Sequence, residues 1–108
     1  MSFFTATVTS AGTSYPASAD TTIPFEARRV SLRNTESSAG DSVFVRFGTV
    51  PSSMLSGDGN DEVEVRANQS FVIERFRIGE LKDFGKVECE VRVRSDAGTP
   101  SVVINAVS

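Results

Sequence analysis

Residues 86–94 read Lys-Val-Glu-Cys-Glu-Val-Arg-Val-Arg, and this stretch decides the fold class. Apolar and charged side chains alternate strictly along it. A period of two puts all the apolar groups on one face of a strand and all the charges on the other. In a helix, the 3.6-residue repeat would scatter the valines around the axis. The stretch therefore predicts a half-buried strand of an antiparallel sheet, with its charged face exposed to solvent.

The composition of the whole chain agrees with this strand. The sequence has 108 residues, the size of one domain, so residues 1–108 are expected to form a single unit. Valine and isoleucine total 18 against 3 leucines, and there are 9 threonines. Because β-branched side chains fit a pleated sheet and lose rotamer freedom in a helix, this balance favours strands.

Further segments show strand patterns, separated by short turns. Together they predict an all-β fold, a single antiparallel β-sandwich of seven to eight strands with Greek-key or jelly-roll connections, although an immunoglobulin-like order suits the same alternation. The final strand is nearly continuous in apolar residues, so we expect it to be buried on both faces. Residues 11–20 are small and polar, which indicates a long loop or an arm that needs another surface to lie on. The expected strands are 3–10, 21–25, 28–34, 42–48, 62–66, 71–78, 86–94 and 101–107.

The sequence offers little for catalysis. It contains no histidine, which removes the commonest general base and metal ligand, and with it the metal chemistry of cupin-type jelly rolls. No glycine-rich phosphate loop occurs. Cys89 is the only cysteine and lies on the apolar face of its strand, so we expect a buried thiol and no intrachain disulfide. We expect no enzyme activity, catalytic residue, cofactor or bound metal.

Two acidic patterns have a plain explanation beside a functional one. Residues 57–62, Gly-Asp-Gly-Asn-Asp-Glu, could offer oxygens to calcium, but they lack the EF-hand spacing and are typical of a solvated turn. Calcium binding stays open. The pairs Glu62/Glu64 and Glu88/Glu90 could suggest glycoside hydrolysis. On an exposed sheet face, these glutamates are explained adequately by pairing with arginines on neighbouring strands, namely Arg66, Arg92 and Arg94.

Charge and arginine content indicate protein partners. The net charge is −3, which disfavours nucleic acid, and the first residues have neither the basic nor the long apolar run of a signal peptide or membrane span. Arginine outnumbers lysine by 9 to 2, which is typical of protein contacts, although a codon bias would give the same ratio. The candidate partner-binding residues are Arg28, Arg29, Arg75, Arg77, Tyr15 and Pro16.

Two regions resemble a known group of proteins. The first comprises residues 21–35, Thr-Thr-Ile-Pro-Phe-Glu-Ala-Arg-Arg-Val-Ser-Leu-Arg-Asn-Thr, and 43–48, Val-Phe-Val-Arg-Phe-Gly. The second is 93–106, Val-Arg-Ser-Asp-Ala-Gly-Thr-Pro-Ser-Val-Val-Ile-Asn-Ala. They resemble small β-sandwich structural proteins of tailed bacteriophage virions, of the head decoration (cement) type. The likeness is one of pattern and has no diagnostic motif.

The resemblance implies a virion protein that is made in the host cytoplasm, binds the outer capsid shell and stabilises it. Its partners would be the major capsid protein or other virion proteins, and it would be a homo-oligomer, either a trimer or a dimer, bound to neither nucleic acid nor membrane. A tail, neck or fibre-base module of the same kind of particle is the nearest alternative. A carbohydrate-binding or adhesive sandwich is more distant, since the chain has no tryptophan and one tyrosine.

Overall fold

The computed structural model describes residues 2–37, 39–48, 62–74 and 89–108, and every regular element in these ranges is a β-strand. Most of the sequence segments between the strands contain glycine, proline or serine, as expected for turns, and the β5–β6 turn of residues 66–69 instead has Asn68 at a positive φ of 59°. The eight strands are β1 (Phe3–Thr9), β2 (Thr21–Ile23), β3 (Arg29–Asn34), β4 (Val43–Phe47), β5 (Glu62–Val65), β6 (Ser70–Glu74), β7 (Cys89–Ser95) and β8 (Ser101–Val107).

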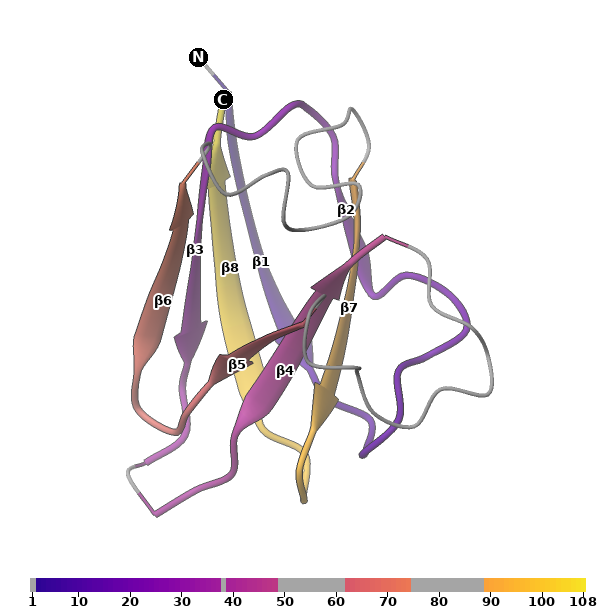
Figure 1. The fold of residues 1–108 in the computed structure, drawn as a ribbon, viewed down its shortest axis with the longest axis vertical. Helices are drawn as coiled ribbons and strands as arrows, with labels where there is room; N and C mark the ends of the chain where they lie inside the picture. The colour runs from indigo at the N-terminus through magenta and orange to yellow at the C-terminus, as the bar shows by residue number, and fades with distance from the viewer. Residues whose placement is uncertain (1, 38, 49–61, 75–88) are drawn as a thin grey trace.

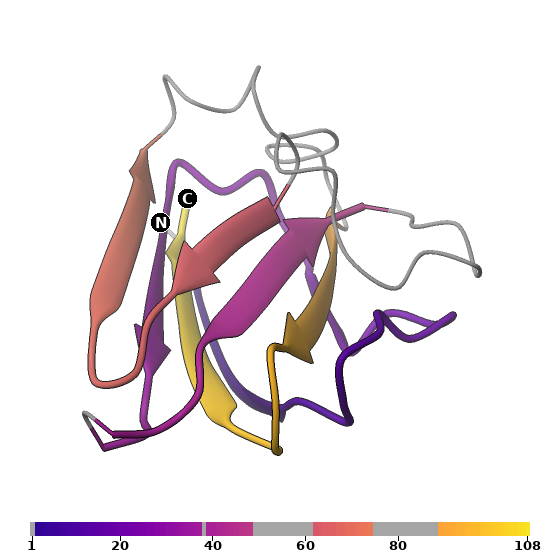
Figure 2. The same cartoon turned by 60° about the horizontal axis from the view of Figure 1, so that its bottom comes forward.

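The strands form two four-stranded antiparallel sheets that pack face to face (Figures 1 and 2). One has the order β1-β8-β3-β6 and is called the β1 sheet; the other has the order β2-β7-β4-β5 and is called the β7 sheet. β1 pairs with β8, β2 with β7, β3 with β6 and β4 with β5. This nested pairing of first with last is the winding of a jelly roll.

The core fills the space between the two sheets, and period-two alternation in the sequence supplies it. In the β7 sheet, Val43, Val45 and Phe47 of β4 face inward beside Val91 and Val93 of β7, and all are at most 2% exposed. In the β1 sheet the inward residues include Val30, Leu32, Ile73, Val102 and Ile104. Burying each such side chain contributes roughly 1.5–3 kcal/mol, so this layer holds the sheets together.

The predicted β-sandwich is therefore confirmed, and the strand order selects the jelly roll over an immunoglobulin-like connection. Cys89 is buried at 3% exposure, as predicted. The expectation for the last strand was wrong, because β8 buries only one face. Val102 and Ile104 point into the core, whereas Val103 is half-buried and Asn105 is exposed on the outer face of the sheet.

Several sequence predictions lie outside the described residues. They are the acidic residues 57–61 of the calcium alternative, residues 75–78 of the expected strand 71–78, and residues 86–88 of the expected strand 86–94, which include Glu88.

One buried polar side chain joins the two sheets. Asn34, the last residue of β3 in the β1 sheet, is fully buried. Its Nδ2 donates to the carbonyl oxygens of Val65 in the β7 sheet (3.0 Å) and of Asp41 (2.8 Å). Its Oδ1 accepts from the backbone N–H of Glu36 at 3.0 Å. The amide thus satisfies three backbone groups at the end of the sandwich where β3 turns toward β4.

Replacing this amide is expected to destabilise the fold. The substitution Asn34→Ala leaves the buried Val65 carbonyl without its donor, so the free energy of unfolding should fall by about 1–3 kcal/mol. Urea denaturation followed by circular dichroism measures the change. Arg33→Ala, at the exposed neighbouring position, is the control and should stay within about 0.5 kcal/mol of wild type. Equal stability of Asn34→Ala and wild type would contradict the role given to Asn34.

Candidate interaction surfaces

The outer face of the β7 sheet is densely charged. β7 directs Glu90, Arg92 and Arg94 outward, because the residues between them point into the core. In register beside them, β4 presents Phe44 and Arg46, and β5 presents Glu62 and Glu64. Arg92 lies directly across from Arg46, and Arg46 from Glu62, so the arginines of two strands meet the carboxylates of a third.

Residues 11–20, called the arm, lie along this face and are tied to β7 at several points. At one end, the N–H of Ser95 donates to the carbonyl of Gly12 at 2.9 Å. At the other, the N–H of Asp20 donates to the carbonyl of Val91 at 2.9 Å, and the N–H of Val93 donates to Oδ2 of Asp20 at 2.8 Å. The arm therefore follows β7 for most of its length.

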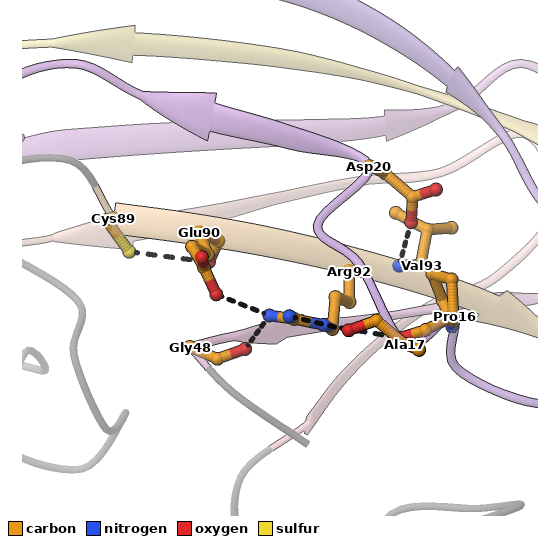
Figure 3. Close-up of polar contacts among 8 residues, drawn as sticks. All are labelled: Pro16, Ala17, Asp20, Gly48, Cys89, Glu90, Arg92 and Val93. Atoms are coloured by element: carbon orange, nitrogen blue, oxygen red, sulfur yellow. Dashed lines mark hydrogen bonds and ion pairs between the residues drawn. The ribbon is translucent and has the colours of Figure 1, made fainter. Parts of the chain in front are cut away.

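Arg92 binds the middle of the arm to the sheet (Figure 3). Its guanidinium donates to the carbonyl oxygens of Pro16 (3.3 Å), Ala17 (3.2 Å) and Gly48 (2.5 Å), and it pairs with Oε1 of Glu90 at 2.8 Å. The side chain is 4% exposed. A planar guanidinium has five N–H donors in a fixed fork, so one side chain can hold three backbone segments together.

Arg94, Glu62 and Tyr15 form a second buried cluster. Arg94 pairs with Glu62 through two hydrogen bonds, Nη2 to Oε1 at 2.8 Å and Nε to Oε2 at 3.2 Å. The Tyr15 hydroxyl donates to the same Oε2 at 2.5 Å. The guanidinium also lies over the ring of Phe44, 4.0 Å from its centre. The side chains of Arg94 and Glu62 are 10% and 9% exposed, so the ion pair is largely shielded from water.

Burial and these charges shift pKa values in directions that fit the geometry. Burial, then the hydrogen bond and charge of Glu62, raise the pKa of Tyr15 far above its ordinary value of about 10, and Arg94 offsets this only in part. Burial alone would lower the pKa of Arg94, but the Glu62 carboxylate outweighs it and raises the pKa. Burial also raises the pKa of Asp20, against the opposing effects of the Val93 N–H and of Arg92.

The sequence predicted that these glutamates pair with arginines of neighbouring strands on an exposed face. Glutamates and arginines do pair, but Glu62 reaches Arg94 across the intervening strand β4, and Glu90 pairs with Arg92 of its own strand. The prediction of exposure was wrong. Taken as whole residues, Arg92 and Arg94 are only 3% and 8% exposed, because the arm covers them. No pattern within residues 86–94 distinguishes a face that meets water from one that meets another segment of the chain.

The candidate partner-binding residues divide into three groups. Arg28 and Arg29 are exposed at the start of β3, where Arg29 makes a long 3.7 Å contact with Glu74. Tyr15 is 5% exposed and its hydroxyl is bonded within the chain, while Pro16 is half-buried and its carbonyl accepts from Arg92. Arg75 and Arg77 lie outside the described residues. The structure therefore leaves Arg28 and Arg29 as the predicted contacts with accessible guanidinium groups.

The outer face of the β1 sheet differs from that of the β7 sheet. In rows across its strands it presents mostly small polar and β-branched groups, such as Thr5, Asn105, Ser31 and Val72 in one row. Phe3 and Val72 are its exposed large apolar residues, at 74% and 38%. Sequence reasoning did not single out this face, although the threonines of β1 alternate with its inward residues.

Metal-ligating side chains do not gather into a site in the described part of the chain. Among them there is no cluster of three or more metal-ligating side chains, and no buried side-chain nitrogen or oxygen lacks a hydrogen-bond partner. Within the same ranges, no helix is long and apolar enough to cross a membrane. Comparisons with protein-family models, with curated proteins and with solved structures find no match.

The buried Tyr15 hydroxyl predicts a loss of stability at alkaline pH. Tyr15 stays protonated in the folded chain but ionises near pH 10 in the unfolded chain, since its folded pKa is raised. The stability that depends on the neutral phenol is fully present below about pH 10 and declines as the pH rises further. Urea unfolding at a series of pH values should show this decline in wild type, and a smaller decline in Tyr15→Phe.

The same residue gives a direct optical control. Tyr15 is the only tyrosine and there is no tryptophan, so phenolate absorbance reports on this side chain alone. Native protein should show no phenolate until it unfolds, whereas urea-unfolded protein should titrate near pH 10. Titration near pH 10 in protein that circular dichroism shows to be folded would contradict the docked arm.

Proposed function

We propose that this chain is a virion structural protein of the head-decoration type, which binds the outer surface of a capsid shell and stabilises it. The observation that carries most weight is the nested strand order β1-β8-β3-β6 and β2-β7-β4-β5. This jelly roll is an architecture used by viral capsid proteins, lectins and cupins. A fold alone does not define a function. The surface of the chain and the residue types that it lacks must therefore distinguish between a capsid protein, a lectin and a cupin.

The chemistry argues against the cupin class and the surface against the lectin class. A cupin holds its metal through histidines, and the sequence has none. Sugar-binding sites use exposed aromatic platforms, but Tyr15 is buried and Phe3 is the exposed aromatic among the described residues. Protein binding remains, and it would act by mass action. A protein that binds only the assembled shell stabilises it by a free energy that grows with the logarithm of its free concentration divided by its dissociation constant.

Arg28 and Arg29 support a contact with an acidic protein surface. Both are exposed, and the Arg29–Glu74 contact is an exposed ion pair of 3.7 Å, a kind that contributes little. Either guanidinium can therefore turn to a carboxylate of a partner and bind it bidentately. The tail, neck or fibre-base module of the same particle remains the second candidate, because the same surface would serve there.

Reversing these two charges should weaken binding to the shell. The assay is co-sedimentation of purified protein with undecorated heads, assembled from the major capsid protein encoded in the same genome. Wild type should bind to saturation, and Arg28→Glu/Arg29→Glu should bind roughly tenfold or more weakly, since like-charge contacts at an interface cost several kcal/mol.

The matched control is Arg33→Glu/Arg66→Glu, which makes the same change in net charge at exposed positions near the opposite end of β3 and just after β5. It should bind within about twofold of wild type. Failure of the wild-type protein to bind heads would remove the decoration proposal. Binding to tails or necks in place of heads would select the second candidate.

A further inference from the structure

The two sheets end in four edge strands: β1 and β6 in the β1 sheet, β2 and β5 in the β7 sheet. An edge strand presents unpaired N–H and C=O groups that can pair with another chain, and proteins usually blunt such edges with charge, proline or short length. Three of the edges carry one of these features. β2 has three residues and is followed by Pro24, β5 carries Glu62 and Glu64, and β6 ends in Glu74.

β1 carries none of these features. With seven residues it is the longest of the four edge strands, and its sequence Phe-Phe-Thr-Ala-Thr-Val-Thr has high strand propensity. No charged side chain occurs in the sequence before Asp20, and the first proline is Pro16. An uncharged, β-branched edge of this length is suited to accept a further strand.

The register of β1 shows which backbone groups are available. Beyond the two ends of β1, the N–H of Ser108 donates to the carbonyl of Ser2, and the N–H of Ser10 donates to the carbonyl of Pro100. Even-numbered residues therefore bond to β8, and alternation directs the N–H and C=O groups of the odd-numbered residues to the outer edge of the sheet, where no strand of the described residues pairs with them. The side chains of Thr5 and Thr7 are exposed as well.

We propose that β1 pairs antiparallel with β1 of a second copy of this chain, around a two-fold axis at Ala6. This register pairs all seven residues and uses the odd-numbered backbone groups. It places Thr5 opposite Thr7 of the partner subunit on the outer face, a pair of β-branched hydroxyl residues that stabilises sheets. The two β1 sheets become one continuous sheet of eight strands, and the contact closes at two copies, as an isologous interface does.

Charge is what selects a second copy as the partner. A strand that pairs with itself brings two copies of the same surface together, so a charge near the two-fold axis would lie close to its own copy and be repelled by it. β8, the next strand inward, also has no charged residue, so the nearest charges on this face belong to Arg29 and Arg33 of β3. In the dimer, the β3 strands of the two copies are five strand spacings apart, about 24 Å, well beyond the screening length of about 8 Å at physiological salt.

Two substitutions in β1 test this interface. Thr7→Pro removes an N–H that faces the free edge and leaves the β8 ladder intact, a position that edge strands tolerate. Thr5→Lys places two ammonium groups near each other across the two-fold axis. By sedimentation equilibrium, wild type should show twice the mass of one chain, and each variant should raise the dimer dissociation constant roughly tenfold or more. Val72→Lys, on the other edge strand of the same sheet, should change it by less than about twofold.

Amide hydrogen exchange supplies a readout that does not depend on variants. As the concentration of wild-type protein rises, the amides of Thr5 and Thr7 should gain protection, while that of Ala6, which already bonds to β8, should change little. A monomer at every concentration would overturn the proposal. So would a trimer, a dimer that Thr7→Pro leaves intact, or one that Val72→Lys disrupts.

This inference does not rest on the shell-binding proposal. Sedimentation and hydrogen exchange use the purified chain without heads. A chain that dimerises through β1 and ignores heads would remove the proposed function and leave the interface. A chain that binds heads as a monomer would support the proposed function and overturn the β1 interface.

Discussion

Two buried arginines in β7, next to the edge strand β2, are the constraint on which the rest of this structure depends. A guanidinium removed from water is tolerated only when it is paired and hydrogen-bonded, because its desolvation costs several kcal/mol. Arg94 meets this requirement with the Glu62 carboxylate, and Arg92 with Glu90 and three backbone carbonyls. Apart from Glu90 of β7 itself, those partners come from β5, from the residue after β4 and from the arm. Satisfying two side chains therefore fixes three separate parts of the chain against one sheet.

Much of the fold could be predicted from the sequence because strand formation leaves a local signature. Alternation along β4 and β7 identified the inward residues correctly, since a side chain's face follows from its parity. Whether an outward residue is exposed to water or covered by another segment of the chain could not be predicted in this way. Arg92 and Arg94 look the same in sequence whether water or the arm covers them, and the arm is made of small polar residues without any period. In β8 the adjacent Val102 and Val103 suggested burial on both sides, but only the first reaches the core.

The two outer faces of the sandwich therefore differ in their side chains and in what covers them. The arm covers the charged outer face of β7, so the polar groups of that face form their hydrogen bonds within the chain. The β1 sheet instead presents threonine, serine, asparagine and valine across most of its rows, with charges confined to β3 and β6. This asymmetry could not be predicted from composition, because it depends on which strands become neighbours. The predicted partner-binding residues differ in the same way. Arg28 and Arg29 are exposed, whereas the Tyr15 hydroxyl is hydrogen-bonded within the chain.

The nested pairing of the jelly roll also sets the order in which the chain can fold. Thr5 of β1 bonds to Asn105 of β8, one hundred positions further along, whereas Val43 and Val65 of the β4–β5 pair are near in sequence. Closing a long loop costs more entropy than closing a short one, and distant pairings slow folding. On the ribosome, β1 is synthesised first and its neighbour in the sheet last. The native β1 sheet is therefore complete only after β8 has left the exit tunnel.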